Sequence, residues 1–353
     1  MTYTRLPSCM PRVTMVKDFA GQHLLSVQGL SREAVETVFF VADLMVPFAE
    51  RRMVTRVLQG AILGNMFFEP STRTRVSFGC AFNLLGGEVR ETIGVESSSL
   101  AKGESLEDTA RVLSGYSDVI VMRHPEGGAV DRFASASRVP VLNGGDGARE
   151  HPTQALLDLY TIRRERAALG LGLDGLRIAL MGDLRYGRAV HSLVQILALY
   201  PKIEFHLISP PELALPEAYE DALRAGGHRV HRHHALAPGL QAADIVYVTR
   251  TQEERFPSSE EAARYRGLFR LNQEIYTAHC APNTVIMHPL PRDSRAGAQE
   301  LDADLDAHPA LAIFRQADNG MLIRMALFAL CLDVVGELEK DVRPVRWYTG
   351  GRR

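Results

Sequence analysis

Apolar residues along this chain form two kinds of pattern, which alternate over most of its length. In one pattern they recur at helical spacing, first over residues 31–58, which indicates one long helix, and last from 321 to about 338. In the other they form short runs that are typical of buried strands. These runs occupy residues 61–68, 119–122, 139–142, 176–181, 203–208, 245–248 and 285–287. Such an alternation predicts an α/β fold with parallel sheets flanked by helices.

The length of the chain predicts two domains, and the two series of strands predict a parallel sheet in each. We expect interdomain helices to link the two domains. The chain has 353 residues, 46% of them hydrophobic, whereas one domain usually has roughly 100–200 residues. The charge-rich stretch 163–174 separates two series of predicted strands, so we place the boundary there. The predicted parts are an N-terminal extension 1–20, a first domain 21–166 completed by a helix at about 321–340, a second domain 167–320, and a tail 341–353.

The balance of charges excludes several classes of partner. Forty basic and 42 acidic residues give a net charge of -2, so no field of the whole protein would attract nucleic acid or an anionic membrane. No apolar run approaches the roughly 20 residues of a membrane span, and the first residues lack the apolar stretch of a signal peptide. The four cysteines are too far apart to indicate a zinc site or a disulfide framework. We therefore expect a cytoplasmic protein.

Segment 69–75, with the sequence Glu-Pro-Ser-Thr-Arg-Thr-Arg, lies where a predicted strand gives way to a predicted helix. Pro70 stops the strand, and Ser71 suits the N-cap of the helix. Backbone N–H groups at a helix start favour an anion, and Arg73 and Arg75 add positive charge. The pattern therefore indicates a phosphate site, although an ordinary capped helix with solvated arginines fits it equally well.

Three further polar residues follow predicted strands, where open α/β sheets bind their ligands. Arg123 follows strand 119–122, while His151 and Gln154 flank a helix start at Pro152. His151 and Gln154 are three residues apart and can face one ligand. A neutral imidazole can donate to a carbonyl oxygen, and the glutamine amide can accept from an amide nitrogen. Taken alone, a surface salt bridge or a capping role would explain these residues as well.

Together these segments resemble the aspartate/ornithine carbamoyltransferase family. The run Phe-x-Glu-Pro-Ser-Thr-Arg-Thr-Arg is similar to the carbamoyl phosphate motif of that family, and segments 122–125 and 151–158 also match. The similarity extends over about residues 30–338. It implies that carbamoyl phosphate is bound by Ser71, Thr72, Arg73, Thr74, Arg123, His151 and Gln154, and that Arg73, Thr74, His151 and Gln154 take part in catalysis. The role of Arg75 stays open.

The polar loop 96–104 contains Lys102, one of only four lysines in the chain. By itself it reads as an ordinary solvated loop. It resembles the mobile loop of the family, from which a serine and a lysine reach the active site of the neighbouring subunit. The resemblance implies that Ser99, or alternatively Ser98, contacts carbamoyl phosphate, and that Lys102 binds aspartate and takes part in catalysis. It also implies a homotrimer with active sites at the subunit interfaces.

Segment 182–188, Gly-Asp-Leu-Arg-Tyr-Gly-Arg, follows a strand as a dinucleotide-binding turn would. It lacks the G-x-G-x-x-G pattern, and the next strand does not end in an acidic residue, so we reject NAD binding as the interpretation. The segment resembles the family pattern G-D-x-x-Y-G-R, and 249–255 resembles T-R-x-Q-x-E-R. These matches imply that Arg188 and Arg250 bind the two carboxylates of aspartate, supported by Gln252. Two guanidinium groups suit a dicarboxylate rather than a cationic acceptor such as ornithine.

Segment 288–292, His-Pro-Leu-Pro-Arg, follows the last predicted strand. The resemblance implies that the backbone carbonyls of Leu290 and Pro291 accept hydrogen bonds from the carbamoyl and aspartate amino groups. Ornithine-specific members tend to have a cysteine in this loop and a Ser-Met-Gly segment, and this sequence has neither.

A group of histidines in the second half of the chain could suggest a metal site: His228, His231, His233 and His234. They fall in a predicted strand, and no aspartate, glutamate or cysteine joins them in register, so we reject this reading. We expect neither a metal nor an organic cofactor.

The reaction implied by the resemblance is transfer of the carbamoyl group from carbamoyl phosphate to the amino group of L-aspartate, in pyrimidine (UMP) synthesis. Carbamoyl phosphate would bind the first domain and aspartate the second, and domain closure would bring the amine against the carbonyl. Two alternatives stay open, namely carbamoylation of another amine and a non-catalytic role in an assembly. A regulatory or dihydroorotase-like partner subunit is compatible with the sequence.

Overall fold

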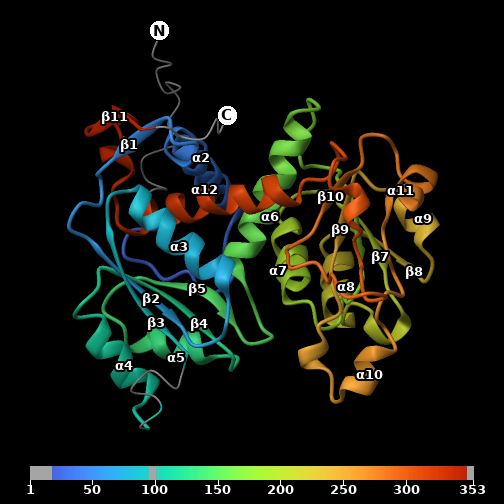
Figure 1. Ribbon diagram of the computed structural model, residues 1–353, viewed down its shortest axis with the longest axis horizontal. Helices are drawn as coiled ribbons and strands as arrows, with labels where there is room; N and C mark the ends of the chain where they lie inside the picture. The colour runs from blue at the N-terminus through green and yellow to red at the C-terminus, as the bar shows by residue number, and fades with distance from the viewer. Residues whose placement is uncertain (1–17, 95–100, 102, 348–353) are drawn as a thin grey trace. The chain divides into compact units, whose positions relative to one another are not determined.

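The chain divides into two compact units (Figure 1). The computed structural model describes residues 18–94, 101 and 103–347. The first unit contains residues 1–153 and 320–353, and the second contains residues 154–319. The chain passes between the units within two helices, α6 (Pro152–Ala167) and α12 (Ile313–Cys331). Each unit contains a parallel sheet flanked by helices, which confirms the predicted α/β class.

The sheet of the first unit has the strand order β3-β2-β4-β5, and all its strands are parallel. Its strands are β2 (Ile62–Phe67), β3 (Glu88–Ile93), β4 (Val119–His124) and β5 (Val141–Asp146). The helices are α2 (Arg32–Ala49), α3 (Thr72–Leu84), α4 (Leu106–Leu113) and α5 (Ala129–Ala136). Apolar residues of α4 and α5 pack against β2 and β4 and form the core on one face of the sheet. Phe328 of α12 packs edge-on against Phe78 and Phe82 of α3.

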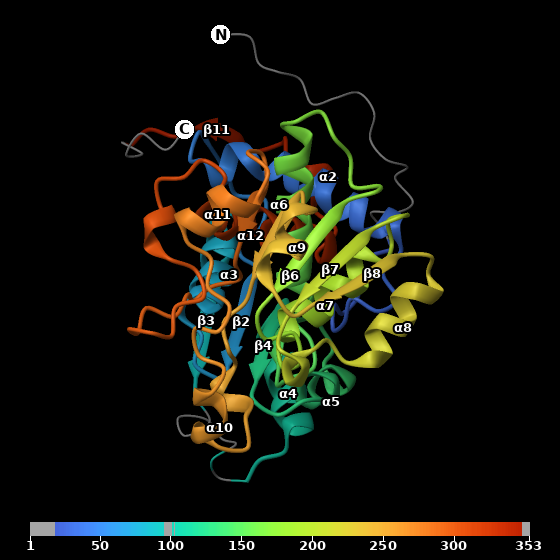
Figure 2. The same cartoon turned by 90° about the vertical axis from the view of Figure 1, so that its right-hand side faces the viewer.

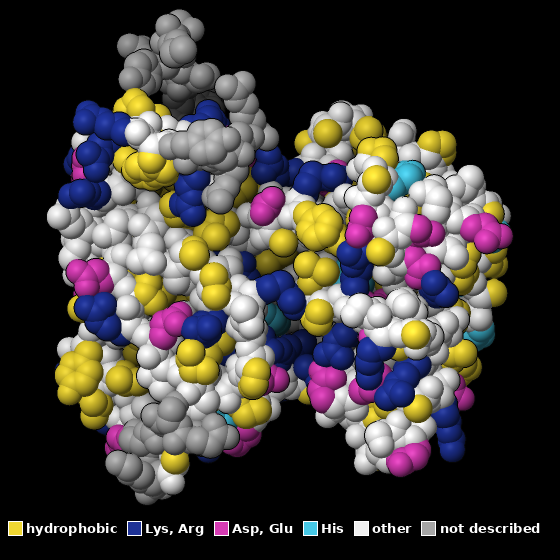
Figure 3. Space-filling model, viewed as in Figure 1, with side chains coloured by type: hydrophobic (Ala, Val, Ile, Leu, Met, Phe, Trp, Pro, Cys, Tyr) yellow, Lys and Arg dark blue, Asp and Glu magenta, His cyan; other side chains and the backbone are white. Residues whose placement is uncertain are grey.

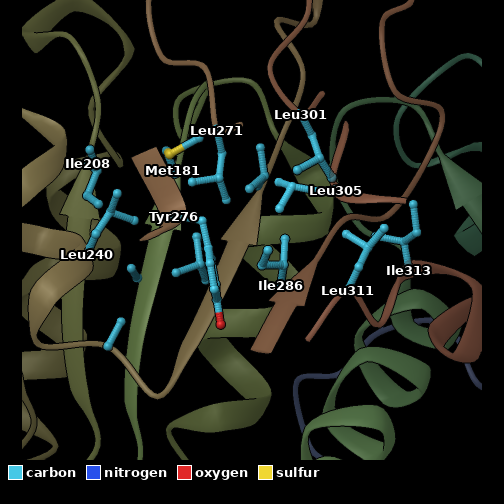
Figure 4. Close-up of a cluster of buried hydrophobic side chains, with 14 residues drawn as sticks. Met181, Ile208, Leu240, Leu271, Tyr276, Ile286, Leu301, Leu305, Leu311 and Ile313 are labelled. Carbon is cyan, nitrogen blue, oxygen red and sulfur yellow. The ribbon is translucent and has the colours of Figure 1, made fainter. Parts of the chain in front are cut away.

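The sheet of the second unit has the order β10-β9-β6-β7-β8 and is also parallel. Its strands are β6 (Arg177–Met181), β7 (Glu204–Ile208), β8 (Arg229–His233), β9 (Ile245–Val248) and β10 (Val285–Met287). The helices are α7 (Arg188–Leu197), α8 (Glu217–Ala225), α9 (Leu236–Gln241), α10 (Ser259–Ala263) and α11 (Gln273–His279). Figure 2 shows β6, β7 and β8 side by side. Met181, Ile208 and Ile286 meet Leu240 and Tyr276 in a buried apolar cluster (Figure 4).

Short elements complete the described part of the chain. Strands β1 (Met53–Thr55) and β11 (Val342–Pro344) form an antiparallel pair, so the expected tail begins with a strand. The 3-10 helices are η2 (Pro211–Leu213), η3 (Glu253–Arg255), η4 (Ala303–Leu305) and η5 (Val335–Glu337). Among the described residues, no helix combines the length and apolar character needed to cross a membrane, and the cytoplasmic location stays a prediction.

Both sheets reverse their strand order at one point. In the first unit the chain runs from β2 to its neighbour β3 and then crosses to β4 on the other side of β2. In the second unit it runs through β6, β7 and β8 and then crosses to β9 on the other side of β6. Open α/β sheets bind ligands at the carboxyl ends of the strands that flank such a reversal. The fold therefore directs attention to the connections after β2 and β4, and after β6 and β9.

Two helix ends differ from the predicted ones. The helix predicted over 31–58 stops at Ala49, and the helix predicted from 321 to about 338 runs instead over 313–331. Both end where a non-glycine residue takes a positive φ, Arg51 at 59° and Asp333 at 53°. The next N–H then reaches back to the helix, from Arg52 to the Pro47 carbonyl in α2 and from Val334 to the Ala329 carbonyl in α12. This arrangement is a Schellman motif, which satisfies the last carbonyls.

Two strands also differ from expectation. Strand β5 begins two residues later than predicted and continues through Asn143-Gly144-Gly145-Asp146, which was expected to be a loop. Its polar residues are tied in place, since Asn143 Nδ2 donates to the Leu25 carbonyl at 2.7 Å. Strand β3 was not predicted, because its residues are mostly polar and exposed at the edge of the sheet.

The face in Figure 3 carries both basic and acidic side chains. The sequence as a whole has nearly balanced charges, with a net charge of -2.

The three histidines on strands β7 and β8 lie close together. The rings of His206 and His231 stack at 5.0 Å, and those of His206 and His233 at 5.3 Å. His206 Nδ1 and His233 Nε2 share a hydrogen bond of 3.0 Å. Burial, followed by the neighbouring histidines, lowers the pKa of His206 to about 4.

We expect the stability of the protein to fall as the pH is lowered from about 6.5 to about 4, because of His206. In this window the unfolded histidine binds a proton that the folded one excludes, so protonation favours unfolding by up to about 3 kcal/mol. Melting temperatures measured across this range should fall less steeply for His206→Asn than for the unchanged chain. Equal slopes for both proteins would contradict the assignment.

Candidate active site

The connection from β2 to α3 forms the first part of the candidate site. Ser71 occupies the N-cap position of α3 as predicted, but its side chain makes no capping hydrogen bond. The first turn of α3 consists of Thr72, Arg73 and Thr74 and contains no acidic residue. The first N–H groups of a helix have no acceptor within the helix, and the helix dipole makes this end positive. The turn thus presents hydroxyl, guanidinium and N–H donors suited to an anion, and we call residues 71–74 the phosphate turn.

Arg75 points to a different partner. Its guanidinium forms a salt bridge with Glu91 on β3, with both side chains partly exposed. Asn65 Nδ2 donates to Glu91 Oε1 at 2.8 Å and to the Arg75 carbonyl at 3.2 Å. Arg75 therefore joins helix α3 to the edge of the sheet.

We expect Arg75→Ala to change kcat and KM by less than about 10-fold, because a partly exposed ion pair contributes about 1 kcal/mol or less. Steady-state kinetics on the variant would measure both constants. A loss of about 10²-fold or more would place Arg75 among the ligand-binding residues instead.

Arg123 is connected to the phosphate turn through Glu69. Its side chain is nearly buried at the carboxyl end of β4, and its Nε lies 2.9 Å from Glu69 Oε2. Its Nη1 donates to the Gly144 carbonyl at 3.4 Å. Burial lowers the pKa of Arg123, while the negative charge of Glu69 opposes this shift. Because Glu69 immediately precedes Pro70 and Ser71, the ion pair brings Arg123 to the connection that carries the phosphate turn.

His151 lies between β5 and α6 and is only 6% exposed. Its Nδ1 is 3.5 Å from Thr153 Oγ1. The preceding residue, Glu150, accepts hydrogen bonds from Ser26 Oγ at 2.7 Å and from the Val27 N–H at 2.9 Å. These contacts with the beginning of the described chain fix the backbone from which the imidazole projects.

Gln154 belongs to the second unit. Its Nε2 donates to Asp158 Oδ1 at 2.8 Å, one helical turn further along α6. Because an ionised carboxylate only accepts hydrogen bonds, the end of the amide that contacts Asp158 must be its nitrogen. The amide oxygen of Gln154 is left as the end that can accept from a ligand.

Two loops of the second unit, after β6 and after β9, are held together by Asp183. The buried carboxylate accepts from the Tyr186 N–H and from the Gln252 N–H, each at 2.9 Å. Burial raises the pKa of Asp183, and these backbone donors oppose the rise. Gly182 has a φ of 114°, and a Cβ there would lie 2.2 Å from the Thr249 carbonyl oxygen, so only glycine allows this close approach.

These loops carry the arginines predicted to bind aspartate. Arg188 is the first residue of α7 and is 9% exposed. Arg250 follows β9, and its two terminal nitrogens contact the two carboxylate oxygens of Glu254, Nη1 at 3.1 Å and Nη2 at 2.5 Å. Gln252 Nε2 donates to the Arg250 carbonyl at 3.2 Å. Glu254 thus holds the Arg250 guanidinium in one orientation.

Residues 288–291 follow β10, and their backbone is fixed by His288. The Leu290–Pro291 peptide bond is cis. His288 Nδ1 accepts from the Leu290 N–H at 2.8 Å, and its Nε2 lies 2.8 Å from Glu300 Oε1. A small pocket of the second unit is lined by residues that include Asp183, Thr249, Thr251 and Glu300.

Two domains of one known protein family match this chain. The carbamoyl phosphate-binding domain of aspartate/ornithine carbamoyltransferases matches residues 22–164, and their aspartate/ornithine-binding domain matches residues 174–331. The chain belongs to the aspartate/ornithine carbamoyltransferase family. The predicted family resemblance is therefore confirmed.

Relatives and solved structures within this carbamoyltransferase family resemble the chain over nearly its whole length. The aspartate carbamoyltransferase catalytic subunit of Saccharophagus degradans is 66% identical over 330 residues, which covers 94% of this chain and 98% of that protein. The corresponding subunit of Cellvibrio japonicus is 64% identical over 335 residues, covering 95% and 99%. The crystal structure of aspartate transcarbamoylase from Trypanosoma cruzi in complex with carbamoyl phosphate and aspartate is 38% identical, with a TM-score of 0.82 and coverage of 90% and 98%.

Three residues predicted to belong to the site lie outside the described residues, namely Ser98, Ser99 and Lys102. Sequence reasoning also missed the carboxylates that orient the predicted site residues. Glu69 and Asp183 each contact a residue far away in the sequence, so no local pattern could reveal them. Asp158 also meets Tyr247 far away in the sequence, but it is only four residues from Gln154, which it orients. Glu254 is four residues from Arg250, a spacing that could have suggested the pair. In the part of the chain that the structure describes, no group of three or more histidine, cysteine or acidic side chains could hold a metal ion.

Proposed function

We propose that the chain transfers the carbamoyl group from carbamoyl phosphate to the amino group of L-aspartate, forming N-carbamoyl-L-aspartate and phosphate, and that it serves pyrimidine synthesis. The observation that carries this proposal is the 66% identity with an aspartate carbamoyltransferase catalytic subunit over 94% of the chain. The presence of two arginines on adjacent loops of the second unit supports a dicarboxylate as the acceptor.

In this proposal the first domain, residues 21–166 completed by about 321–340, binds carbamoyl phosphate. The Ser71 hydroxyl, the N–H groups of the phosphate turn and the guanidinium groups of Arg73 and Arg123 take the phosphate. His151 donates to the carbamoyl oxygen, and the amide oxygen of Gln154 accepts from the carbamoyl nitrogen. The orientation of Gln154 on Asp158 supports this last role.

The second domain, residues 167–320, binds aspartate. Arg188 and Arg250 each bind one carboxylate of the substrate. The Gln252 side chain supports Arg250 by donating a hydrogen bond to the Arg250 backbone carbonyl. The carbonyls of Leu290 and Pro291 accept from the carbamoyl and amino groups of the substrates. We assign Lys102 to aspartate and Ser99, with Ser98 as the alternative, to carbamoyl phosphate, from the resemblance of loop 96–104 to the mobile loop of the family.

The chemistry follows from these contacts. The aspartate amine attacks the carbamoyl carbon, and the carbonyl oxygen becomes an oxyanion that Arg73, Thr74 and His151 stabilise. The oxyanion then collapses, the bond between carbon and the phosphate oxygen breaks, and phosphate leaves. The departing phosphate accepts a proton from the amine, so no separate base is required.

An assay of carbamoyl transfer with aspartate and with ornithine tests the proposal. Formation of carbamoyl aspartate from carbamoyl phosphate, with little or no citrulline from ornithine, is the expected result. A preference for ornithine would overturn the acceptor, and turnover with neither amine would overturn catalysis by the isolated chain.

We further propose a homotrimer in which Lys102 completes the site of a neighbouring subunit, alone or joined to regulatory or dihydroorotase-like subunits. Sedimentation equilibrium of the purified chain should give three times the chain mass. Mixing Lys102→Ala and Arg73→Ala chains under exchanging conditions should restore part of the activity, since some shared sites then receive neither substitution. A monomer, or no recovery on mixing, would overturn the shared site.

A further inference from the structure

The buried carboxylate of Asp158 on α6 connects Gln154 to two other elements of the second unit. Asp158 is 0% exposed. Its Oδ1 accepts from Gln154 Nε2 at 2.8 Å and from Gln316 Nε2 at 2.6 Å. Its Oδ2 accepts from the Tyr247 hydroxyl at 2.6 Å. These donors come from α6, α12 and β9, so one carboxylate ties three elements together.

The network continues to the loop that carries Leu290 and Pro291. Gln316 Oε1 accepts from the His288 N–H at 3.0 Å, which requires Gln316 to turn its Nε2 toward Asp158. The Leu290 N–H in turn donates to His288 Nδ1 at 2.8 Å. A continuous hydrogen-bonded path therefore leads from the Gln154 side chain to the backbone of residues 288–290.

We propose that Asp158 is a positioning residue for carbamoyl transfer, which holds the Gln154 amide with its oxygen toward carbamoyl phosphate and fixes the loop of Leu290 and Pro291. This inference rests on the proposed function. In this inference Asp158 itself contacts no substrate. It acts through Gln154 and Gln316.

The chemical argument is one of matched donors and acceptors. An ionised carboxylate offers only acceptors, so both glutamines must present their N–H groups to it. Burial raises the pKa of Tyr247 well above its usual value, as does the adjacent Asp158, so the phenol keeps its proton and donates. Without the carboxylate, the Gln154 amide could rotate by half a turn and present N–H to the carbamoyl nitrogen, where two donors would face each other.

Kinetics of Asp158→Ala and Asp158→Asn test this role. We expect Asp158→Ala to raise the KM for carbamoyl phosphate by about 10-fold or more, because it removes the charged acceptor for Gln154. Asp158→Asn should recover most of the loss. Its oxygen can replace Oδ1, while the Tyr247 hydroxyl turns to accept from its N–H₂ group. Asp244→Ala is the matched control, since Asp244 pairs with Arg166 and Arg177 instead of the glutamines. It should leave the KM for carbamoyl phosphate and the KM for aspartate unchanged.

A double variant separates positioning from general support of the fold. If Asp158 acts on carbamoyl phosphate chiefly through Gln154, adding Asp158→Ala to Gln154→Ala should raise the KM for carbamoyl phosphate by no more than about 3-fold further, which is the part of the effect that passes through Gln316. If the increases in KM of the two single variants multiply in the double variant, the inference is overturned. Unchanged kinetics in a folded Asp158→Ala protein would overturn it as well. Absence of turnover by the unchanged chain would overturn the proposed function, and the inference with it. Thermal unfolding of each variant shows whether the fold is retained, and Asp158→Asn decides the matter if the alanine variant does not fold.

Discussion

Replacing Arg73 by alanine is expected to lower kcat by about 10²- to 10³-fold while the chain keeps its fold. Arg73 lies in the first turn of α3, where the helix dipole and the N–H groups already favour negative charge. In the transition state this charge grows on the carbamoyl oxygen and on the departing phosphate, so a donor aimed there stabilises the transition state more than the substrate. Removal of one such donor typically costs about 2.7–4 kcal/mol.

The measurement is steady-state kinetics together with circular dichroism and thermal unfolding. Arg73→Lys should restore only part of the activity, because an ammonium group cannot form two parallel hydrogen bonds to phosphate. Arg132→Ala is the matched control, since this exposed arginine of α5 forms a surface pair with Glu126. Near-normal turnover by a folded Arg73→Ala protein would remove Arg73 from the mechanism.

The parts of the fold that could be predicted are those with a local signal. Strands β6, β9 and β10 are buried on both faces, so they read as continuous apolar runs. Gly86, with a φ of 95°, marks the end of α3 because glycine takes this conformation without cost. Arg51 and Asp333 take the same conformation at the ends of α2 and α12, but their side chains give no such signal. The ends of those two helices therefore required the structure.

The residues of the candidate site also fall into those that a local sequence pattern reveals and those that it does not. The phosphate turn is contiguous in sequence, so its anion-binding character could be inferred from a strand, a helix start and two arginines. Its connection to Arg123 depends on Glu69, 54 positions earlier in the chain, and only pairing of β2 with β4 brings these residues together. Asp158 on helix α6 meets Tyr247 on strand β9 across 89 positions, a contact that only the folded chain creates. Residues expected to contact ligands can thus be predicted from motifs, whereas a residue such as Glu69, which orients one of them from far away in the sequence, is revealed only by tertiary contacts.

Replacing Arg250 by alanine is expected to lower kcat/KM for aspartate by about 10²-fold or more, with little change in the KM for carbamoyl phosphate. A guanidinium that forms two charged hydrogen bonds to a carboxylate contributes about 1.5–3 kcal/mol for each. Arg250 is already oriented by Glu254, so little side-chain freedom is lost when the substrate binds. Variation of each substrate in turn, at saturation of the other, measures the two KM values separately.

Two further variants sharpen this test of Arg250. Glu254→Gln keeps the arginine and removes the charge that orients it, so its effect on aspartate should have the same direction but be smaller. Arg229→Ala removes an exposed arginine on β8 of the same unit and should leave both KM values unchanged. Equal weakening of both substrates by Arg250→Ala would indicate a disturbed fold rather than a lost carboxylate ligand. A selective effect on aspartate would instead tie the choice of acceptor to this side chain, because the phosphate turn can bind carbamoyl phosphate whichever amine follows.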